Sequence, residues 1–420
     1  MHTAPTDHRP RLLLVASGMR PYREYLLASI ATAYRVHLFH SADPDWERPY
    51  LDGWTVLGST IDGPAMAAAA RPLHREEPFA GVLCWDEGRI HATSSIAAEL
   101  GCRNGDPTVV WRLRDKAQTR QALAAAGVPQ PRSVPVNSVQ EALLAAAAIG
   151  YPVILKPRGL GASLGVVRVD DSDGLRRLFP FTHGTTAPDP VQYSTDAPVL
   201  VEQCVCGTEV SVDAVVTDGQ VVPLFVARKK VGYPPYAEEV GHLVDAADPL
   251  LHDGAFVDLL QRTHGALGFR DGCTHTEYML TEDGPQLIEV NGRLGGDMIP
   301  YLGKLATGVD PGLVAAAAAC GLPPRTVPTR RRVAGVTFSY VDSDDTTVTS
   351  VTIDHARLPP TVDHVVTLVS AGQVVSPPPK GTVWGRIAYV TAVADTWQEC
   401  QAALDVATRA VAFTRHEKRR

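Results

Sequence analysis

The feature of the sequence that most constrains the fold is a change in the spacing of its apolar segments near residue 151. Before that point, continuous apolar runs such as RLLLVAS at residues 11–17 and GVLCW at residues 81–85 alternate with helical patterns. Strands that alternate with helices form a parallel sheet that is covered on both faces. After residue 151, short β segments follow one another through Gly and Asp-Gly turns, which predicts a mostly antiparallel sheet. The sequence therefore predicts a parallel α/β unit joined to a larger α+β part.

The chain of 420 residues is long enough for several domains, and four units are predicted. A parallel-sheet unit is expected at residues 11–112, followed by two facing halves at 113–198 and 199–325. The proline-rich and charged segment 322–332 is the expected linker. It leads to a small α+β unit at 333–415.

Composition excludes several classes of protein. The chain is 45% hydrophobic and 20% charged, and its apolar runs are much shorter than the roughly 20 residues of a membrane span. Seven scattered cysteines without a C-x-x-C pair predict neither a disulfide framework nor a zinc site. The net charge of −7 without a clustered basic face argues against a nucleic-acid partner. We expect a cytoplasmic protein that binds neither membranes nor nucleic acids.

A pair of glutamates on a predicted hairpin indicates a metal site. The segments THTEYML and QLIEVN flank a turn centred near Asp283, so Glu277 is expected to face Glu289. Carboxylates that face each other across a hairpin repel, and a shared cation removes that cost. Asn291 adds a third hard oxygen ligand on the same face, a set suited to Mg²⁺, whereas a register shifted by one would turn one carboxylate to solvent. Arg293 follows on that face, where it would stabilise charge on a phosphoryl group or an oxyanion.

A glycine-rich stretch, KPRGLGASLG at residues 156–165, allows three interpretations. Gly161, Ala162 and Ser163 open a match to the G-x-S-x-G nucleophile elbow, but an elbow needs a helix behind it and the next residues, VVRV, favour a strand. A glycine hairpin that offers backbone N–H groups and the Ser163 hydroxyl to phosphate fits better. A plain turn remains the third interpretation.

Three further groups of polar residues are weaker candidates. Glu202 and Glu209 lie at strand ends among apolar residues, where a nucleotide or a structural lysine would satisfy them. Glu87 follows Asp86 at the carboxyl end of a strand, as a substrate contact or in a solvated turn. His242 is expected in a loop among acidic residues, where a surface position is the simplest interpretation.

The order of these stretches resembles the ATP-grasp superfamily. The resemblance rests on RDK with Lys116, LKPRGLGASLG, VEQCVCGTE and the E…E-x-N-x-R pattern, and it covers about residues 113–300. The DE pair at residues 86–87, His242 and NGRLGGD look like L-amino acid ligases of the bacilysin synthetase type. The resemblance implies an ATP-grasp fold, α/β and α+β, behind an N-terminal parallel-sheet domain and before a small C-terminal α+β subdomain.

The resemblance also implies an activity. It is that of an ADP-forming ligase that joins a carboxylate, such as an amino acid, to an amine through an acyl phosphate, with ATP and one or two Mg²⁺ or Mn²⁺ ions. A role in specialised metabolism and a homodimer are compatible with it. The alternatives are loading of a carrier protein, action on formate- or bicarbonate-type carboxylates, and a non-catalytic nucleotide-binding protein.

The residues that the resemblance implies for ATP lie in the lid loop and at the adenine hinge. They are Lys116 and Lys156 for the phosphates, Gly161, Ala162 and Ser163 in the closing loop, Glu202 and the Val205 backbone for adenine, and Glu209 for ribose.

The remaining roles concern the metal and the substrates. The implied metal ligands are Glu277, Glu289 and Asn291, the implied catalytic residues are Arg293 and Lys156, and the implied substrate-binding residues are Glu87, His242, Arg293 and Gly296. Asp297 and the segment MIPYL that follows it are expected to border the pocket of the amine substrate.

Overall fold

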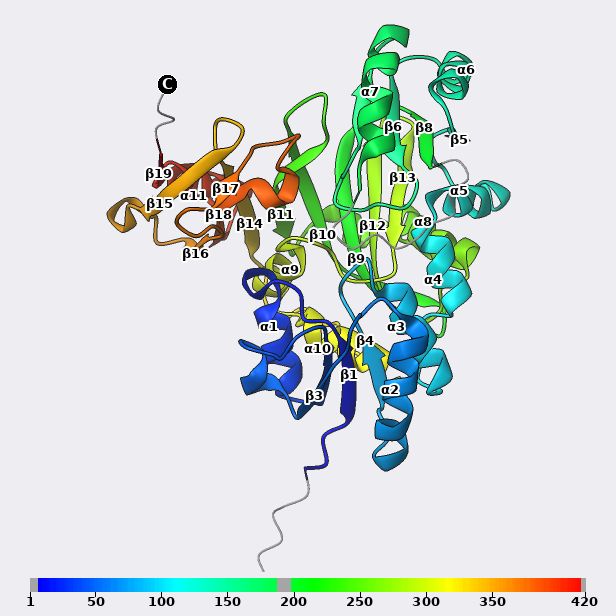
Figure 1. Ribbon diagram of the computed structural model, residues 1–420, viewed down its shortest axis with the longest axis vertical. Helices are drawn as coiled ribbons and strands as arrows, with labels where there is room; N and C mark the ends of the chain where they lie inside the picture. Colours follow the sequence, from blue (N-terminus) through cyan, green and yellow to red (C-terminus); the bar gives the residue numbers. More distant parts are fainter. Residues whose placement is uncertain (1–6, 187–197, 417–420) are drawn as a thin grey trace, which may run out of the picture.

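A computed structural model describes residues 7–186 and 198–416 of the chain. Figure 1 shows the N-terminal unit at the bottom of the view, a unit containing α6 and α7 at the top, and the C-terminal strands at the upper left. The strands of the described residues form sheets of four, eight, three and four strands. No helix within these two ranges is long and apolar enough to cross a membrane.

The N-terminal sheet is parallel, with the strand order β3-β2-β1-β4, as expected from its alternating pattern. Its elements are β1 (Arg11–Val15), α1 (Arg20–Ala31), β2 (Arg35–His40), β3 (Gly53–Val56), α2 (Gly63–Glu76), β4 (Gly81–Leu83) and α3 (Ile90–Glu99). The alanine-rich helix α10 (Pro311–Ala319) packs on this sheet so closely that a Cβ atom at Gly81 would lie 2.5 Å from the carbonyl oxygen of Ala319. The small side chains of α10 permit this approach.

A second sheet, the lid sheet, has the antiparallel order β5-β8-β6-β7 and a core of its own. The elements from its approach helices onward are α4 (Pro107–Arg114), α5 (Lys116–Ala125), β5 (Ser133–Val136), α6 (Val139–Ile149), β6 (Val153–Pro157), β7 (Val167–Val169), α7 (Ser172–Gly184) and β8 (Val199–Gln203). The predicted boundary between residues 198 and 199 is wrong, because β8 pairs with both β5 and β6. The lid sheet therefore continues to Gln203.

The eight-stranded central sheet has the order β13-β12-β9-β10-β11-β14-β18-β16. Its strands are β9 (Thr208–Thr217), β10 (Gln220–Gly232), β11 (Glu238–Asp245), β12 (Gly272–Thr281), β13 (Gly284–Asn291), β14 (Val333–Tyr340), β16 (Val362–Thr367) and β18 (Arg386–Ala394). Three helices pack against this sheet: α8 (Gly254–Leu267), α9 (Ile299–Thr307) and α11 (Trp397–Thr408).

The C-terminal unit expected at residues 333–415 is joined to the central sheet. Strand β14 pairs with β11, so the segment after the proline-rich linker extends the central sheet. Only β15 (Thr346–Ile353), β17 (Val374–Val375) and β19 (Val411–Arg415) form a small sheet of their own. One hydrophobic core, with Leu14, Phe225 and Phe338 among its members, joins the N-terminal sheet, the central sheet and the C-terminal strands.

Candidate active site

Most of the residues that the sequence singles out line one cavity of about 250 Å³ between the lid sheet and the central sheet. These residues are Lys116, Lys156, Gly161, Ala162, Ser163, Glu202, Val205, Glu209, Glu277, Glu289, Asn291, Arg293 and Gly296. A second cavity of about 500 Å³ shares Gly161, Arg293 and Gly296 with it and extends to the N-terminal unit, where Glu87 lines it. We call the two the lid cavity and the N-terminal cavity.

The glutamate hairpin has the expected register. Glu277 of β12 pairs with Glu289 of β13, and His275 pairs with Asn291. A carboxylate oxygen of Glu289 lies 3.0 Å from the Lys116 ammonium. The Asn291 amide group lies 3.2 Å from carboxylate oxygens of Glu289 and Glu87, which leaves a donor role for its nitrogen. Hard oxygen ligands thus converge on one wall of the cavity, the donor set that Mg²⁺ takes.

Lys229 of β10 is a site residue that the sequence analysis missed. Its side chain is 1% exposed, and its ammonium lies 3.0 Å from Glu209, 2.8 Å from Glu239 and 2.8 Å from Glu277. Burial by itself would raise the pKa of Glu277, but Lys229 and His275 lower it to about 2. Burial raises the pKa of Glu209 despite the same lysine. One cation thus holds three carboxylates beneath the cavity.

Glu202 also has cationic partners. It lies 2.7 Å from Arg120 of α5 and 2.6 Å from Lys156 of β6, and all three side chains are buried. Burial opposes the effect, yet Arg120 and Lys156 lower the pKa of Glu202 to about 2. Burial is the larger influence on Lys156 and lowers its pKa to about 8. With this lowered pKa, Lys156 is still mostly protonated at neutral pH but loses its proton more readily than an exposed lysine.

The glycine loop joins two strands, β6 and β7, so the context of a nucleophile elbow is absent from the structure. Ala162 and Ser163 adopt positive φ angles of 55° and 53°, and Gly165 has φ 71°. A Cβ atom on Gly165 would lie 2.8 Å from Pro157. The Lys116 ammonium donates to the carbonyl oxygen of Leu160 within the loop. The loop therefore covers the lid cavity in a conformation that its small residues permit.

Glu87 lies at the carboxyl end of β4, where ligands bind in parallel sheets. It forms ion pairs with Arg114, at the end of α4, and with Arg293, whose Nε lies 2.5 Å away. Burial would raise the pKa of Glu87, but the two arginines lower it to about 2. Glu87 is thus a largely enclosed, ionised group at the wall of the N-terminal cavity rather than part of a solvated turn.

The expected place of His242 is wrong, because the residue lies on strand β11 and is 2% exposed. Its Nε2 atom lies 3.1 Å from Asp297 and 3.2 Å from Glu239. Burial opposes protonation, but both carboxylates raise the pKa of His242. Asp297 in turn lies 2.6 Å from Arg386 of β18, so His242 supports the cavity wall from behind.

Asp213 of β9 is a second residue that the sequence analysis missed. It is fully buried, accepts a hydrogen bond of 2.6 Å from His275, and accepts another of 2.9 Å from the backbone N–H of Gly295. A Cβ atom on Gly295 would lie 3.0 Å from both side chains. Asp213 therefore fixes the hairpin against the loop that carries Arg293. This contact joins segments that are distant in the sequence, so no local motif predicts it.

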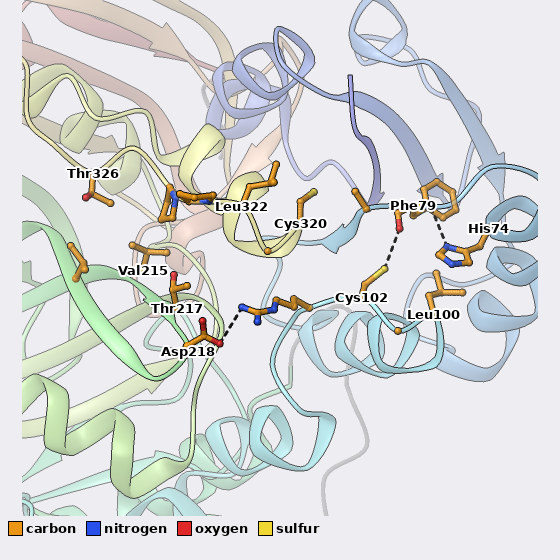
Figure 2. Close-up of a pocket in the computed structure, with 17 residues that line it drawn as sticks. His74, Phe79, Leu100, Cys102, Val215, Thr217, Asp218, Cys320, Leu322 and Thr326 are labelled. Atoms are coloured by element: carbon orange, nitrogen blue, oxygen red, sulfur yellow. Dashed lines mark hydrogen bonds and ion pairs between the residues drawn. The ribbon is translucent and has the colours of Figure 1, made fainter. Parts of the chain in front are cut away.

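Another cavity, of about 880 Å³, lies elsewhere and is shown in Figure 2. Phe79 and Ala80 line it just before β4, at the end of the parallel sheet opposite to its ligand-binding edge. Cys102 donates to the carbonyl oxygen of Phe79 there, and Arg103 pairs with Asp218 at 3.2 Å. This cavity shares no lining residue with the lid cavity or the N-terminal cavity, so it is not part of the candidate active site.

The chain is similar to known proteins in sequence and in fold. Residues 149–301 match the family model described as an ATP-grasp domain. The chain carries an ATP-grasp domain. A solved L-amino acid ligase from Bacillus licheniformis has the same ATP-grasp fold, with a TM-score of 0.78 and 21% identity over 98% of this chain and 100% of that one. The predicted fold class is confirmed.

Two curated relatives of this ATP-grasp protein share sequence with it. The uncharacterized protein y4rH of Sinorhizobium fredii is 33% identical over 328 residues, which are 73% of this chain and 64% of that protein. The alanine–anticapsin ligase of Bacillus subtilis is 27% identical over 236 residues, which are 51% of this chain and 49% of that enzyme. The chain thus spans less than two thirds of the length of these relatives. The expected resemblance to amino-acid ligases of the ATP-grasp type is confirmed.

Proposed function

We propose that the protein is an ADP-forming ligase that joins a carboxylate, such as an amino acid, to an amine. The observation that carries the proposal is the junction of two cavities at Arg293, Gly161 and Gly296. The lid cavity supplies lysines, a glycine loop and facing glutamates, which suit ATP. The N-terminal cavity supplies room for organic substrates beside them.

The nucleotide is proposed to lie in the lid cavity. Lys116 and Lys156 would hold its phosphates under the glycine loop, with Ser163 as a donor. Val205 and the ion-paired Glu202 line the same cavity, where we propose that they contact the adenine ring. Glu209 also lines it and is the proposed contact of the ribose.

Glu277, Glu289 and Asn291 would hold Mg²⁺, with Mn²⁺ as a substitute. The structure supports this fit, because two carboxylates face each other on one wall and both lie within ion-pair distance of an ammonium group, so this wall attracts positive charge. When bound, the metal neutralises phosphate charge during phosphoryl transfer.

The residues of the chain then act in two steps. In the first, Lys116, Lys156 and Arg293 hold the γ-phosphate against the substrate carboxylate, whose attack gives an acyl phosphate and ADP. In the second, an amine displaces the phosphate, and Arg293 stabilises the negative oxygen of the tetrahedral intermediate. Glu87 fixes the Arg293 guanidinium for both steps through their 2.5 Å ion pair.

Closure of the lid would exclude water from the acyl phosphate. The lid sheet has its own core, which includes Val136, Leu155 and Val201. A unit with a separate core can move against the central sheet without opening the shared core below it. His242, Gly296 and Asp297 are proposed to shape the pocket of the amino-acid substrates.

The test is release of ADP by the purified protein with ATP, Mg²⁺ and pairs of amino acids, together with detection of the amide product. ADP should appear only when both substrates are present. Glu289→Gln should lower the rate about a thousandfold, because a metal ligand is lost. The matched control is Glu282→Gln, an exposed residue at the turn of the same hairpin, which should leave the rate unchanged.

Two outcomes would contradict parts of the proposal. Full activity of Glu289→Gln would overturn the metal assignment. ADP release that requires a carrier protein, or that proceeds with formate or bicarbonate alone, would replace the amino-acid reaction by one of its alternatives. A homodimer and a place in specialised metabolism remain predictions from the sequence.

A further inference from the structure

Within residues 7–186 and 198–416, the charged side chains that line the N-terminal cavity form ion pairs with one exception. Arg89 lies 2.7 Å from Asp86, Arg293 pairs with Glu87, and Arg386 pairs with Asp297. Arg114 shares the Glu87 carboxylate.

Arg23, from helix α1, also lines this cavity, but no carboxylate of the described residues lies within ion-pair distance of it. Its Nη1 atom donates to the carbonyl oxygens of Tyr22 and Asp297, both at 3.2 Å. Both acceptors are neutral, so neither contact compensates the charge of the guanidinium.

The position of Arg23 is set by its surroundings. Gly18, at the carboxyl end of β1, has φ 74°, and a Cβ atom there would lie 3.0 Å from Cγ of Arg23 and 3.4 Å from Nε1 of Trp85. The side-chain stem of Arg23 thus occupies the space that Gly18 leaves. Trp85 is itself fixed by a hydrogen bond of 2.9 Å to the carbonyl oxygen of Ser17.

The start of helix α1 adds to the positive potential around Arg23. Gly18, Met19 and Tyr22 line the cavity together with Arg23, so the helix begins at its wall. The first turn of α1 carries no acidic residue that would offset the positive end of the helix.

We propose that Arg23 binds a carboxylate that the ligase does not activate and that remains in the product, and that it thereby selects substrates with such a group. This inference rests on the proposed ligase function. The carboxylate that becomes an acyl phosphate belongs beside Lys156 and Glu289 in the lid cavity. A second carboxylate in the N-terminal cavity meets Arg23, a planar donor that is suited to carboxylates.

Two substrate groups have this chemistry. One is the α-carboxylate of an amino acid that supplies the amine, and the other is an acidic side chain of the amino acid that is activated. The carbonyl of Asp297, which Arg23 contacts, lies at the wall shared by both cavities, so either group can reach it.

The kinetic test compares the parent protein with Arg23→Gln. Amine substrates are offered as free amino acids and as their carboxamides, and glutamate is compared with glutamine as the activated substrate. Arg23→Gln should raise KM about 10- to 100-fold for the carboxylate form that Arg23 reads, with little change in kcat. KM for the matching amide should not change.

Arg20→Gln is the matched control, because Arg20 lies on the same helix, is 60% exposed and pairs with Glu24. It should leave both KM values unchanged. Arg23→Lys, which keeps the charge, should recover part of the preference. If Arg23→Gln loses the preference for the free amino acid over its carboxamide, Arg23 binds the α-carboxylate of the amine substrate. If it loses the preference for glutamate over glutamine, Arg23 binds the acidic side chain of the activated substrate. An Arg23→Gln protein that keeps both preferences would overturn the proposal.

A binding measurement separates this proposal from the proposed function. Isothermal titration of the parent and Arg23→Gln with the twenty common L-amino acids and their carboxamides, in the presence of ADP and Mg²⁺, requires no turnover. Acid-over-amide preference in the parent that Arg23→Gln loses supports the role of Arg23 even if no amide is ever formed, in which case only the ligase function fails. Absence of any preference in the parent would overturn the role of Arg23.

Discussion

Two largely enclosed charge clusters at the candidate site have opposite compositions. In the first, one lysine, Lys229, contacts three glutamates. In the second, one glutamate, Glu87, contacts two arginines, Arg114 and Arg293. Carboxylates are in excess in one cluster and guanidinium groups in the other.

The difference shows how a single site can receive ligands of both signs. An excess of buried carboxylates is favourable once a divalent cation is present, whereas an excess of arginines favours phosphates and carboxylates. The acidic cluster stands on neighbouring strands of one sheet, β9 to β12. The basic cluster is assembled from the ends of β4, α4 and β13, segments that only the tertiary fold brings together.

The largest effect is expected when the acidic cluster loses its lysine. Lys229→Met would leave the partly buried carboxylates of Glu209, Glu239 and Glu277 without their shared buried cation, so the free energy of unfolding should fall by about 3–5 kcal/mol. Chemical denaturation at neutral pH measures the change. Since the carboxylates would then need another cation, added Mg²⁺ should stabilise the variant more than the parent.

Lys230→Met is the matched control, because Lys230 is the next residue of β10 and is exposed. It should change the stability by no more than about 0.5 kcal/mol. Equal stability of both variants would mean that Lys229 does not hold the acidic cluster together.

The sequence sufficed for the parts of the site that are local. The pairing of Glu277 with Glu289 follows from the length of one turn, and the glycine loop between two strands follows from the β-branched residues behind it. Lys229 could not be found in this way. Its place under Glu277 depends on the strand order β12-β9-β10, which a single sequence does not contain.

The error at His242 has the same origin. The stretch EEVGH contains charges that favour a loop when they are considered alone. In the fold, Lys229 neutralises Glu239, and Asp297 accepts from His242, so a charged segment can form the buried strand β11. The boundary predicted at residue 198 has the same explanation. Strand β8 belongs to the lid sheet because it pairs with β5 and β6, which lie far from it in the sequence.

Glu238 offers an intermediate case, a buried carboxyl that has no ion-pair partner among the described residues. The Tyr340 hydroxyl donates to it at 2.9 Å, but burial dominates and raises its pKa from 4.5 to about 7. The unfolded chain therefore loses this proton at lower pH than the folded protein, so the charge of Glu238 costs stability as the pH rises from about 4.5 to 7. Glu238→Gln should remove that cost.

The expected result is a gain in the free energy of unfolding that grows by about 2 kcal/mol between pH 5 and pH 8. Denaturation curves of the parent and variant at both pH values give the difference directly. Glu76→Gln, which changes an exposed carboxylate, should show no such growth. A gain that is equal at both pH values would show that Glu238 is ionised throughout.

The smallest effect is expected in the lid, where no charge cluster is involved. If Ser163 donates a neutral hydrogen bond to phosphate, Ser163→Ala should lower kcat/KM for ATP by about fivefold, whereas loss of a nucleophile would lower it by several orders of magnitude. Gly165→Ala should have the larger effect of the two, because its φ of 71° and the 2.8 Å approach to Pro157 leave no room for a Cβ atom. Activity that falls more with Ser163→Ala than with Gly165→Ala would mean that the hydroxyl, and not the shape of the loop, governs this side of the site. Because the substrates supply both reacting groups in the proposed reaction, the lid contributes shape and the two clusters contribute charge.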